Sequence, residues 1–261
     1  MVKVALSYYT PAMATKWPTI QPPVPRELLP KHIAVIMDGN GRWARSKGLV
    51  RARGHEAGVE AVRDSVRYCG QFHVAALTLY AFSTENWKRP RREVEYLMRL
   101  LKKYLSEEFE ELHLNGVRLT SIGETHELPE DVRAELHKVQ DHTARNSGLN
   151  LCLALNYGAQ DELAGAVRQV AMQVAAGEVA PESGSEQALD AALHTAGMPA
   201  LDLLIRTAGE RRLSNFLLWQ ASGAEFHVEE ACWPDFRREH LKRAIEEYAG
   251  RKQDKRKGKG A

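Results

Sequence analysis

The sequence is poor in cysteine and has no long apolar run. Its three cysteines, Cys69, Cys152 and Cys232, lie far apart and form no CxxC pair. This spacing excludes a disulfide framework and a zinc site built from thiolates, and it fits a reducing cytoplasm. No apolar run approaches the roughly 18 residues of a membrane span, and the apolar stretch at the start is too short for a secretory signal. We therefore expect a cytoplasmic protein.

Net charge is also nearly absent. The 261 residues hold 36 Lys and Arg against 34 Asp and Glu, a formal charge of +2. This balance gives no argument for a nucleic-acid partner. A composition of 44% hydrophobic and 27% charged residues is that of an ordinary soluble globular protein, and the length allows one large domain or two small ones.

The two ends of the chain differ from its middle. Six of the 11 prolines fall within residues 1–30, which predicts an extended or mobile arm. Residues 251–261 have six basic residues, one acidic residue and no apolar residue larger than alanine, which predicts a disordered basic tail. Such a tail can attract an anionic membrane surface weakly or remain a passive solvated segment. The folded body is then a single domain over 31–250.

Within the body, short apolar runs rich in β-branched residues alternate with stretches of helical periodicity. The runs predict strands at 32–37, 74–82, 117–123, 149–155, 201–205 and 224–230. Helices are predicted after the first strand, over 92–113, 129–140 and 237–249, and between the strands at 149–155 and 201–205. This alternation predicts an α/β fold, with a mostly parallel central sheet of about six strands flanked by helices.

Polar segments rich in glycine or arginine follow four of the predicted strands, at 38–55, 83–90, 156–158 and 206–215. Ligands of open α/β sheets bind beyond the carboxyl ends of the strands, so we expect these segments to gather at one edge. At least five arginines and a glycine-rich turn that opens a helix suit a highly anionic ligand such as phosphate. Asp38 and Glu225 can supply the sparse carboxylates of a Mg²⁺ site that also uses phosphate oxygens.

Each of these segments also has a purely structural interpretation. Asp38, Ser83 and Thr84 belong to residue types that cap helices, the glycines can serve a tight turn, and the arginines of 206–212 can form a solvated face. His55 has no role that the sequence alone decides. The sequence contains no GxGxxG, HExxH or GxSxG pattern and no GxxxxGK followed by Ser or Thr. The common nucleotide-binding folds, zinc peptidases and serine hydrolases therefore lose support.

Five blocks stand out: HIAVIMDGNGRWA (32–44), RxxGH (51–55), LTLYAFSTENWKRP (77–90), LALNYG (153–158) and DLLIRTAGERRLSNFLLWQ (202–220). In this order they resemble the signature blocks of the cis-prenyltransferases, of the bacterial isoprenyl transferase or undecaprenyl diphosphate synthase type. The DDxxD motif of trans-prenyltransferases is absent. The resemblance covers about 32–235, nearly all of the predicted body.

The resemblance implies a fold and a reaction. A homodimeric enzyme of the cis-prenyltransferase fold would condense isopentenyl diphosphate onto an allylic diphosphate such as farnesyl diphosphate, with Mg²⁺ and a cis double bond at each addition. The likeness to the undecaprenyl type favours that product, a lipid carrier for the cell wall. A synthase of short or irregular isoprenoids remains the alternative. A non-catalytic subunit is disfavoured because the Asp38 block is intact. Residues 91–116 hold no insertion of the kind expected for a very long product.

The resemblance also implies residue roles. Asp38 is the central catalytic carboxylate and, with Glu225 reaching across the dimer, a metal ligand. Asn86 is implied as proton acceptor, and because an amide is a weak base we expect water or a diphosphate oxygen to share that task. The implied substrate-binding residues are Gly39, Asn40, Gly41, Arg42, Trp43, Arg51, His55, Ser83, Thr84, Glu85, Trp87, Arg89, Arg206, Arg212, Leu213 and Ser214.

Two further points concern the geometry of the site. The growing hydrocarbon chain needs an apolar tunnel, and the helix at 92–113 can form one wall through Val94, Leu97, Leu101 and Leu105, although such a stripe also suits plain core packing. Ala208 stands where the family pattern leads us to expect glycine. Its added methyl group restricts the loop if that residue needs a positive φ.

Overall fold

A computed structural model describes residues 15–180 and 186–258 of the chain. Six strands form one parallel sheet in the order β3-β4-β2-β1-β5-β6. They are β1 (His32–Ile36), β2 (Ala76–Ser83), β3 (Arg118–Ile122), β4 (Asn150–Tyr157), β5 (Leu203–Arg206) and β6 (Glu225–Val228). The predicted α/β fold with a parallel sheet of about six strands is confirmed.

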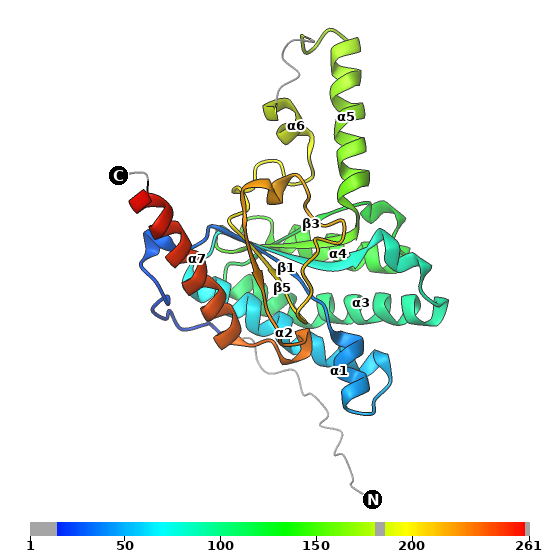
Figure 1. Cartoon of the computed structure of the whole chain (residues 1–261). Coiled ribbons are helices and arrows are strands. Elements are labelled where there is room, and N and C mark those ends of the chain that lie inside the picture. Colours follow the sequence, from blue (N-terminus) through cyan, green and yellow to red (C-terminus); the bar gives the residue numbers. More distant parts are fainter. Residues whose placement is uncertain (1–14, 181–185, 259–261) are drawn as a thin grey trace, which may run out of the picture.

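The described part of the chain contains seven α-helices, and most of them pack around this sheet (Figure 1). They are α1 (Asn40–Ser46), α2 (Arg51–Phe72), α3 (Arg91–Leu114), α4 (Glu130–Thr143), α5 (Ala159–Ala175), α6 (Glu186–Ala192) and α7 (Arg238–Gly258). Among the described helices, none is both long and apolar enough to cross a membrane.

The strands are apolar because both faces of the sheet are covered. On one face, alternate residues such as Val35 and Leu79 pack against α2, α3, α4 and α7. On the other face, residues such as Ile36 and Ala154 pack against the segment after β5 and the start of α5. The rest of α5 projects away from the body together with α6 (Figure 1), and its Val167 and Met172 are exposed.

The strand order creates a crevice at the carboxyl edge of the sheet. From β1 the chain crosses to β2 on one side, whereas it later enters β5 on the other side. Ile36 and Arg206 are partners in the register between β1 and β5. The loops that leave these two strands therefore diverge from one point, which is where open α/β sheets bind ligands.

The prediction of a disordered tail from residue 251 is wrong for residues 251–258, because α7 continues through Gly258. Arg251 forms ion pairs with Glu225 on β6 and with Glu247 one turn earlier on α7. Lys255 also pairs with Glu225. These contacts pair two positive charges that would otherwise repel each other and extend the helix beyond its last apolar residue.

The prediction for residues 1–30 falls partly outside the described residues, which start at 15. Residues 15–30 contain one 3-10 turn, Arg26–Leu28, and otherwise run without regular structure. This segment lies on the body: Leu28 and Leu29 are buried, and the Trp17 indole nitrogen donates to Glu111 on α3 at 2.6 Å.

Candidate active site

Asp38 and Arg206 join the loops after β1 and β5. The Arg206 guanidinium donates to Asp38 Oδ2 at 2.8 Å, and Asp38 Oδ1 accepts from the Gly39 backbone nitrogen at 2.7 Å. The Thr207 hydroxyl accepts from the Asp38 nitrogen and donates to the Asp38 carbonyl oxygen. Arg206 is only 2% exposed, whereas the Asp38 side chain is 33% exposed. The carboxylate is thus fixed from within and open to a ligand from outside.

The turn from Asp38 into α1 depends on glycine. Gly39 has a φ of 99°, and a Cβ there would lie 2.8 Å from the Cβ of Ala208. A Cβ at Gly54 would lie 2.0 Å from the Asn40 carbonyl oxygen, so this glycine lets α2 pack against the first turn of α1. Gly39, Asn40 and Gly41 line a cavity that is described below, and the backbone N–H groups at the start of α1 suit an anion there.

The loop after β5 is held in an uncommon backbone conformation. Ala208, Ser214, Asn215 and Leu217 all have positive φ values, between 45° and 68°. The Ala208 nitrogen donates to Ala231, and its carbonyl accepts from Arg42 at 2.8 Å. The position that carries alanine in place of the expected glycine therefore does need a positive φ. Clusters of such residues are typical of ligand-binding loops, where the surrounding contacts hold the strain.

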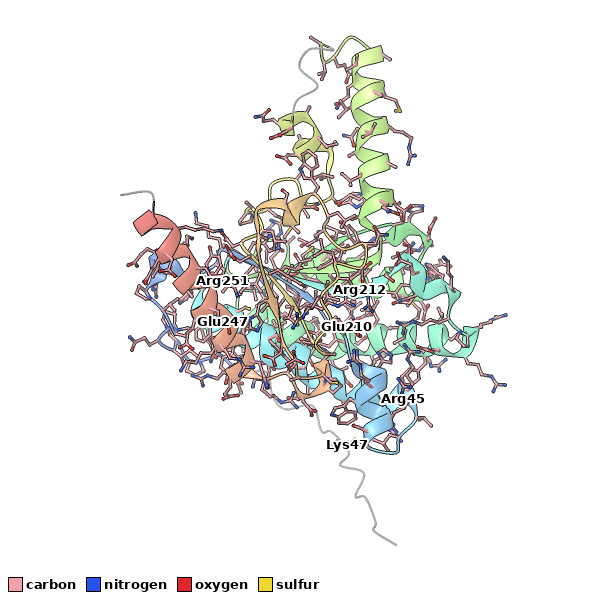
Figure 2. The ribbon with its side chains drawn as sticks, in the orientation of Figure 1. Arg45, Lys47, Glu210, Arg212, Glu247 and Arg251 are labelled. Carbon is pink, nitrogen blue, oxygen red and sulfur yellow. The ribbon has the colours of Figure 1, made fainter. Side chains whose placement is uncertain are left out.

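Three arginines predicted to bind substrate converge on this loop. Arg206 donates to the Ser214 hydroxyl at 2.7 Å and to the Arg212 carbonyl oxygen. Arg42 and Arg212 both pair with Glu210, so one carboxylate holds the two guanidinium groups near each other. Figure 2 shows Glu210 and Arg212 together, near the middle of the molecule.

His55 lies on α2 beside two further arginines. Burial, together with the positive charges of Arg89 and Arg51, lowers the pKa of His55 to about 4. Among the described residues its Nε2 is buried without a hydrogen-bond partner, and the same holds for Nε of Arg206. Glu93 on α3 pairs with Arg51 at 3.3 Å and with Arg89 at 2.9 Å. A neutral imidazole and two arginines thus line the same cavity as Ser214.

Ser83 and Asn86 form a capping box at the 3-10 turn Thr84–Lys88, which follows β2. The Ser83 nitrogen donates to the Asn86 carboxamide oxygen at 3.3 Å. The structural interpretation of Ser83 as a cap is therefore correct, yet both side chains also line the cavity. The capping contact fixes the orientation of the Asn86 amide toward that cavity.

Asp38, His55 and Asn86 lie at one end of a cavity of about 300 Å³ between the sheet, α2 and α3. Ten of the predicted site residues line it: Asp38, Gly39, Asn40, Gly41, Arg51, His55, Ser83, Asn86, Arg89 and Ser214. The other end is apolar, with Val59 and Val62 from α2 and Leu97 and Leu101 from α3. Val94 and Leu105, which the periodicity assigned to the same wall, pack in the core instead.

Several cavity residues were not predicted. Tyr80, Met98, Tyr104 and Trp233 also line the cavity. Trp233 lies far along the chain but donates its indole N–H to the Gly58 carbonyl oxygen at 2.9 Å, which brings it beside α2. The helical stripe signals Tyr104, which lies seven residues after Leu97, whereas no local pattern signals Trp233.

Eight predicted binding residues do not line this cavity: Arg42, Arg206 and Arg212, whose contacts are given above, and Trp43, Thr84, Glu85, Trp87 and Leu213. The Trp43 indole donates to Asp235, and the Trp87 indole donates to Asn156 and lines a separate pocket between α3 and α4. Glu85 accepts from Asn215, and Thr84 lies against Gly158. Leu213 packs at the edge of the apolar cluster on the second sheet face. In this conformation these five side chains support the loops of the site: Trp43, Thr84, Glu85, Trp87 and Leu213.

Glu225 is not brought to Asp38 within one chain. Glu225 is the register partner of Leu203 at the amino end of β5, whereas Asp38 lies beyond its carboxyl end. The hydrogen bond from Lys255 and the pairing with Arg251 lower the pKa of Glu225. Figure 2 places Arg251 on α7, away from Glu210 and Arg212. Among the described residues, no group of three or more potential metal-ligating His, Cys, Asp or Glu side chains is present.

The arrangement suits one type of ligand. The polar end of the cavity has arginines, a neutral histidine, backbone N–H groups and one open carboxylate, and the other end has apolar walls. Such a cavity fits a molecule with an anionic head and a hydrocarbon tail.

Comparisons with known proteins agree with this geometry. Residues 36–258 match the family described as "Putative undecaprenyl diphosphate synthase". The chain is 53% identical over 222 residues to an isoprenyl transferase of Brucella suis biovar 1, covering 85% of this chain and 87% of that protein. It is 49% identical over 223 residues to an isoprenyl transferase of Clostridium tetani, covering 85% and 88%.

Two solved structures are also similar. Lavandulyl diphosphate synthase from Lavandula x intermedia, in complex with dimethylallyl diphosphate, has a TM-score of 0.83 and 32% identity, covering 85% of this chain and 96% of that one. A probable undecaprenyl diphosphate synthase from Campylobacter jejuni has a TM-score of 0.69 and 34% identity, covering 84% and 94%. The chain therefore belongs to the undecaprenyl diphosphate synthase family and is a prenyltransferase.

Proposed function

We propose that this prenyltransferase condenses isopentenyl diphosphate with an allylic diphosphate, with farnesyl diphosphate as the primer, and forms each new double bond in the cis configuration. The observation that carries the proposal is the Asp38–Arg206 pair at the polar end of an apolar cavity. This end can receive two diphosphates side by side, and the deep end can receive the hydrocarbon chain of the primer. The lavandulyl enzyme, similar in fold, was solved with a related allylic diphosphate, which supports this substrate class.

The roles of the residues follow from the charge that the reaction moves. The bond between the allylic carbon and its diphosphate oxygen breaks, and the electron pair stays with the leaving diphosphate. Fixed donors stabilise that charge more in the transition state than in the ground state. The start of α1, Arg51 and the neutral His55 are placed to hold the allylic diphosphate, because all of them line the same polar end. We assign Arg206, Arg212 and Ser214 to isopentenyl diphosphate, because Arg206 donates to the Ser214 hydroxyl and to the Arg212 carbonyl oxygen and so holds these residues together.

The second half of the reaction needs a proton acceptor. The double bond of isopentenyl diphosphate forms the new carbon–carbon bond, and a proton then leaves the isopentenyl unit. Asn86 is held by its capping contact at the cavity wall, where its amide can orient a water molecule. An amide is a weak base, so we assign the proton to that water or to an oxygen of the leaving diphosphate.

Magnesium fits the polar end as a partner of phosphate. Asp38 offers an oxygen ligand on a side chain that is 33% exposed, and Mg²⁺ typically binds one or two carboxylates together with substrate phosphates. When bound, the ion would neutralise the charge that develops on the diphosphate. Glu225 can take part only from a second copy of the chain, because its own Asp38 lies at the opposite edge of the sheet.

A homodimer is the assembly we propose. In the described part of the chain no strand pairs with the outer edge of β6, and α5 projects from the body with Val167 and Met172 exposed. Unpaired edges and exposed apolar side chains are features that a second copy can cover. We also propose a cytoplasmic enzyme that contacts the membrane loosely through its product and its basic end, with no nucleic-acid partner.

Two candidate functions differ in the length of the prenyl product. Similarity to the undecaprenyl diphosphate synthases favours a lipid carrier of eleven isoprene units for cell-wall synthesis. The cavity volume of about 300 Å³ favours a shorter product, and the similar fold of a lavandulyl diphosphate synthase, solved with dimethylallyl diphosphate, supports the alternative of a short or irregular isoprenoid.

The test is incubation with farnesyl diphosphate, radiolabelled isopentenyl diphosphate and Mg²⁺, followed by sizing of the products. Label in a product of around eleven units supports the first candidate function, and a product of two to four units supports the second. Absence of any labelled prenyl product from folded protein would overturn the proposed function.

A further inference from the structure

The helices α2 and α3 lie side by side and run in the same direction, with polar pairs at both ends of their shared length. At the end nearest Asp38, Arg51 pairs with Glu93, and Tyr96 donates to Glu56. At the far end, Arg63 pairs with Glu108 at 2.6 Å, and Arg67 pairs with Glu111 at 3.1 Å. Between these two sets of contacts the facing side chains are apolar and line the cavity.

Tyr104 is the cavity-lining residue of α3 farthest from the polar end. It is 7% exposed, and burial, aided by the nearby Glu108 carboxylate, raises the pKa of its phenol. Glu108 follows one helical turn later and is itself 7% exposed. The Arg63–Glu108 pair therefore stands directly behind the ring and links α2 to α3 there. A hydrocarbon tail that passed the ring would have to displace this buried ion pair.

The length of the cavity follows from helix geometry. Glu93 and Glu108 are fifteen residues apart on α3, which at about 1.5 Å per residue gives about 22 Å. An extended isoprene unit has four backbone bonds and spans roughly 5 Å with carbon–carbon bonds of about 1.5 Å. The space between the polar pairs therefore holds about four units, whereas eleven units would need roughly 55 Å.

We propose that Tyr104, held in place by the Arg63–Glu108 pair behind it, is the residue that limits the length of the prenyl chain. The proposal rests on the proposed function. Tyr104 is eleven residues after Glu93, about 16 Å along α3. In the conformation described, a farnesyl primer of roughly 15 Å therefore fits above the ring, and the first addition brings the tail to Tyr104. Products longer than this require the ring to turn aside, so the frequency of that movement sets the distribution of product lengths.

The first experiment compares product lengths made by the wild type, Tyr104→Ala, Tyr104→Phe and Leu105→Ala. Tyr104→Ala removes the ring and is expected to shift the distribution to longer chains by at least one unit. Tyr104→Phe keeps the ring and is expected to match the wild type. Leu105 is fully buried in the core beside Tyr104 but does not line the cavity, so Leu105→Ala controls for general loosening of α3. Tyr104→Leu makes the same test if the alanine variant does not fold.

The second experiment does not need turnover, so it separates this proposal from the proposed function. Binding of n-alkyl diphosphates of 8 to 22 carbons is measured by calorimetry (lengths chosen around about 16 carbons, the number that fills the cavity). Each added methylene should tighten binding about fourfold until the tail meets Tyr104, and the gain should then stop. In Tyr104→Ala the stop should move to longer chains.

An unchanged stop and an unchanged product distribution in folded Tyr104→Ala would overturn the proposal, as would an equal shift in Leu105→Ala. Failure of the wild type to bind any alkyl diphosphate would overturn it as well. A wild type that shows the stop but makes no prenyl product would overturn the proposed function and leave the role of Tyr104 as a length limit supported.

Discussion

Replacement of Arg206 by methionine is the most informative perturbation of stability. Methionine keeps much of the volume of arginine but removes the charge and all donors. Arg206 is 2% exposed and donates to Asp38 Oδ2, to the Ser214 hydroxyl and to the Arg212 carbonyl oxygen. The variant therefore leaves three acceptors without their donor and releases the loop that contains four non-glycine residues of positive φ.

The magnitude follows from the environment of the pair. Removing one partner of a buried ion pair costs about 3–5 kcal/mol. Asp38 is 33% exposed, so water can solvate part of its carboxylate, which places the expected loss at the lower end, about 3 kcal/mol. For a protein of this size that loss lowers the Tm by about 6–12 °C.

The assay is urea denaturation followed by fluorescence of the five tryptophans. The control is Arg212→Met, because the Arg212 side chain is 65% exposed and its pairing with Glu210 is worth at most about 1 kcal/mol. A loss below about 1 kcal/mol in Arg206→Met, or equal losses in the two variants, would refute the view that Arg206 fixes Asp38 and the loop after β5.

Three other predictions follow. Ala208→Gly should raise the free energy of unfolding by about 0.5–1 kcal/mol, because glycine relieves the cost of a φ of 68° at only a partial entropic penalty in the unfolded chain; a decrease in Tm would contradict this. His55 has a pKa of about 4 in the folded protein against an ordinary value of 6.5, so the unfolded chain binds more protons between these values and stability should fall as the pH drops from about 6.5 to about 4. Subtracting the stability curve of His55→Phe from that of the wild type should isolate this contribution, a total loss of up to about 3 kcal/mol in the free energy of unfolding over that pH range. Parallel curves would contradict a lowered pKa of His55. Glu225→Gln should cost less than about 1 kcal/mol of stability, since Arg251 and Lys255 are its only charged partners among the described residues; a large loss of turnover in that folded variant would support a metal-binding role across a dimer, and normal turnover would end that hypothesis.

The strands could be predicted because their environment is uniform. A parallel sheet covered on both faces needs continuous apolar runs, and His32–Ile36 and Leu203–Arg206 are such runs. The helical structure of residues 251–258 could not be predicted in this way. It depends on Glu225, which is distant in sequence and meets Arg251 and Lys255 only in the folded chain.

The site was predictable where a loop follows a strand directly. Asp38 and Arg206 lie at the ends of neighbouring strands, so topology alone brings them together. The sequence does not fix the direction of a side chain that could turn either way. Trp43 and Trp87 each lie within a signature block, but their indole N–H groups find the acceptors Asp235 and Asn156 away from the cavity. The sequence does not reveal which acceptor lies within reach.

The depth of the cavity could not be predicted from the sequence either. A helical stripe predicts which residues of α3 face inward, but not whether they face a cavity or the core. Leu97 and Leu101 face the cavity, whereas Val94 and Leu105 are packed. Ion pairs join α2 and α3 at both ends of the apolar stretch, and they link residues that are far apart in the sequence, so the stripe alone does not signal where the cavity ends.

The central claim is that Asp38 acts at the polar end of the cavity in the condensation of two diphosphates. The most direct test is the turnover of Asp38→Ala with saturating farnesyl diphosphate, isopentenyl diphosphate and Mg²⁺, alongside its Tm. The account predicts a folded protein whose turnover is lower by about a hundredfold or more, as expected for a group that acts mainly in the transition state. Near-normal turnover in the folded variant would contradict it.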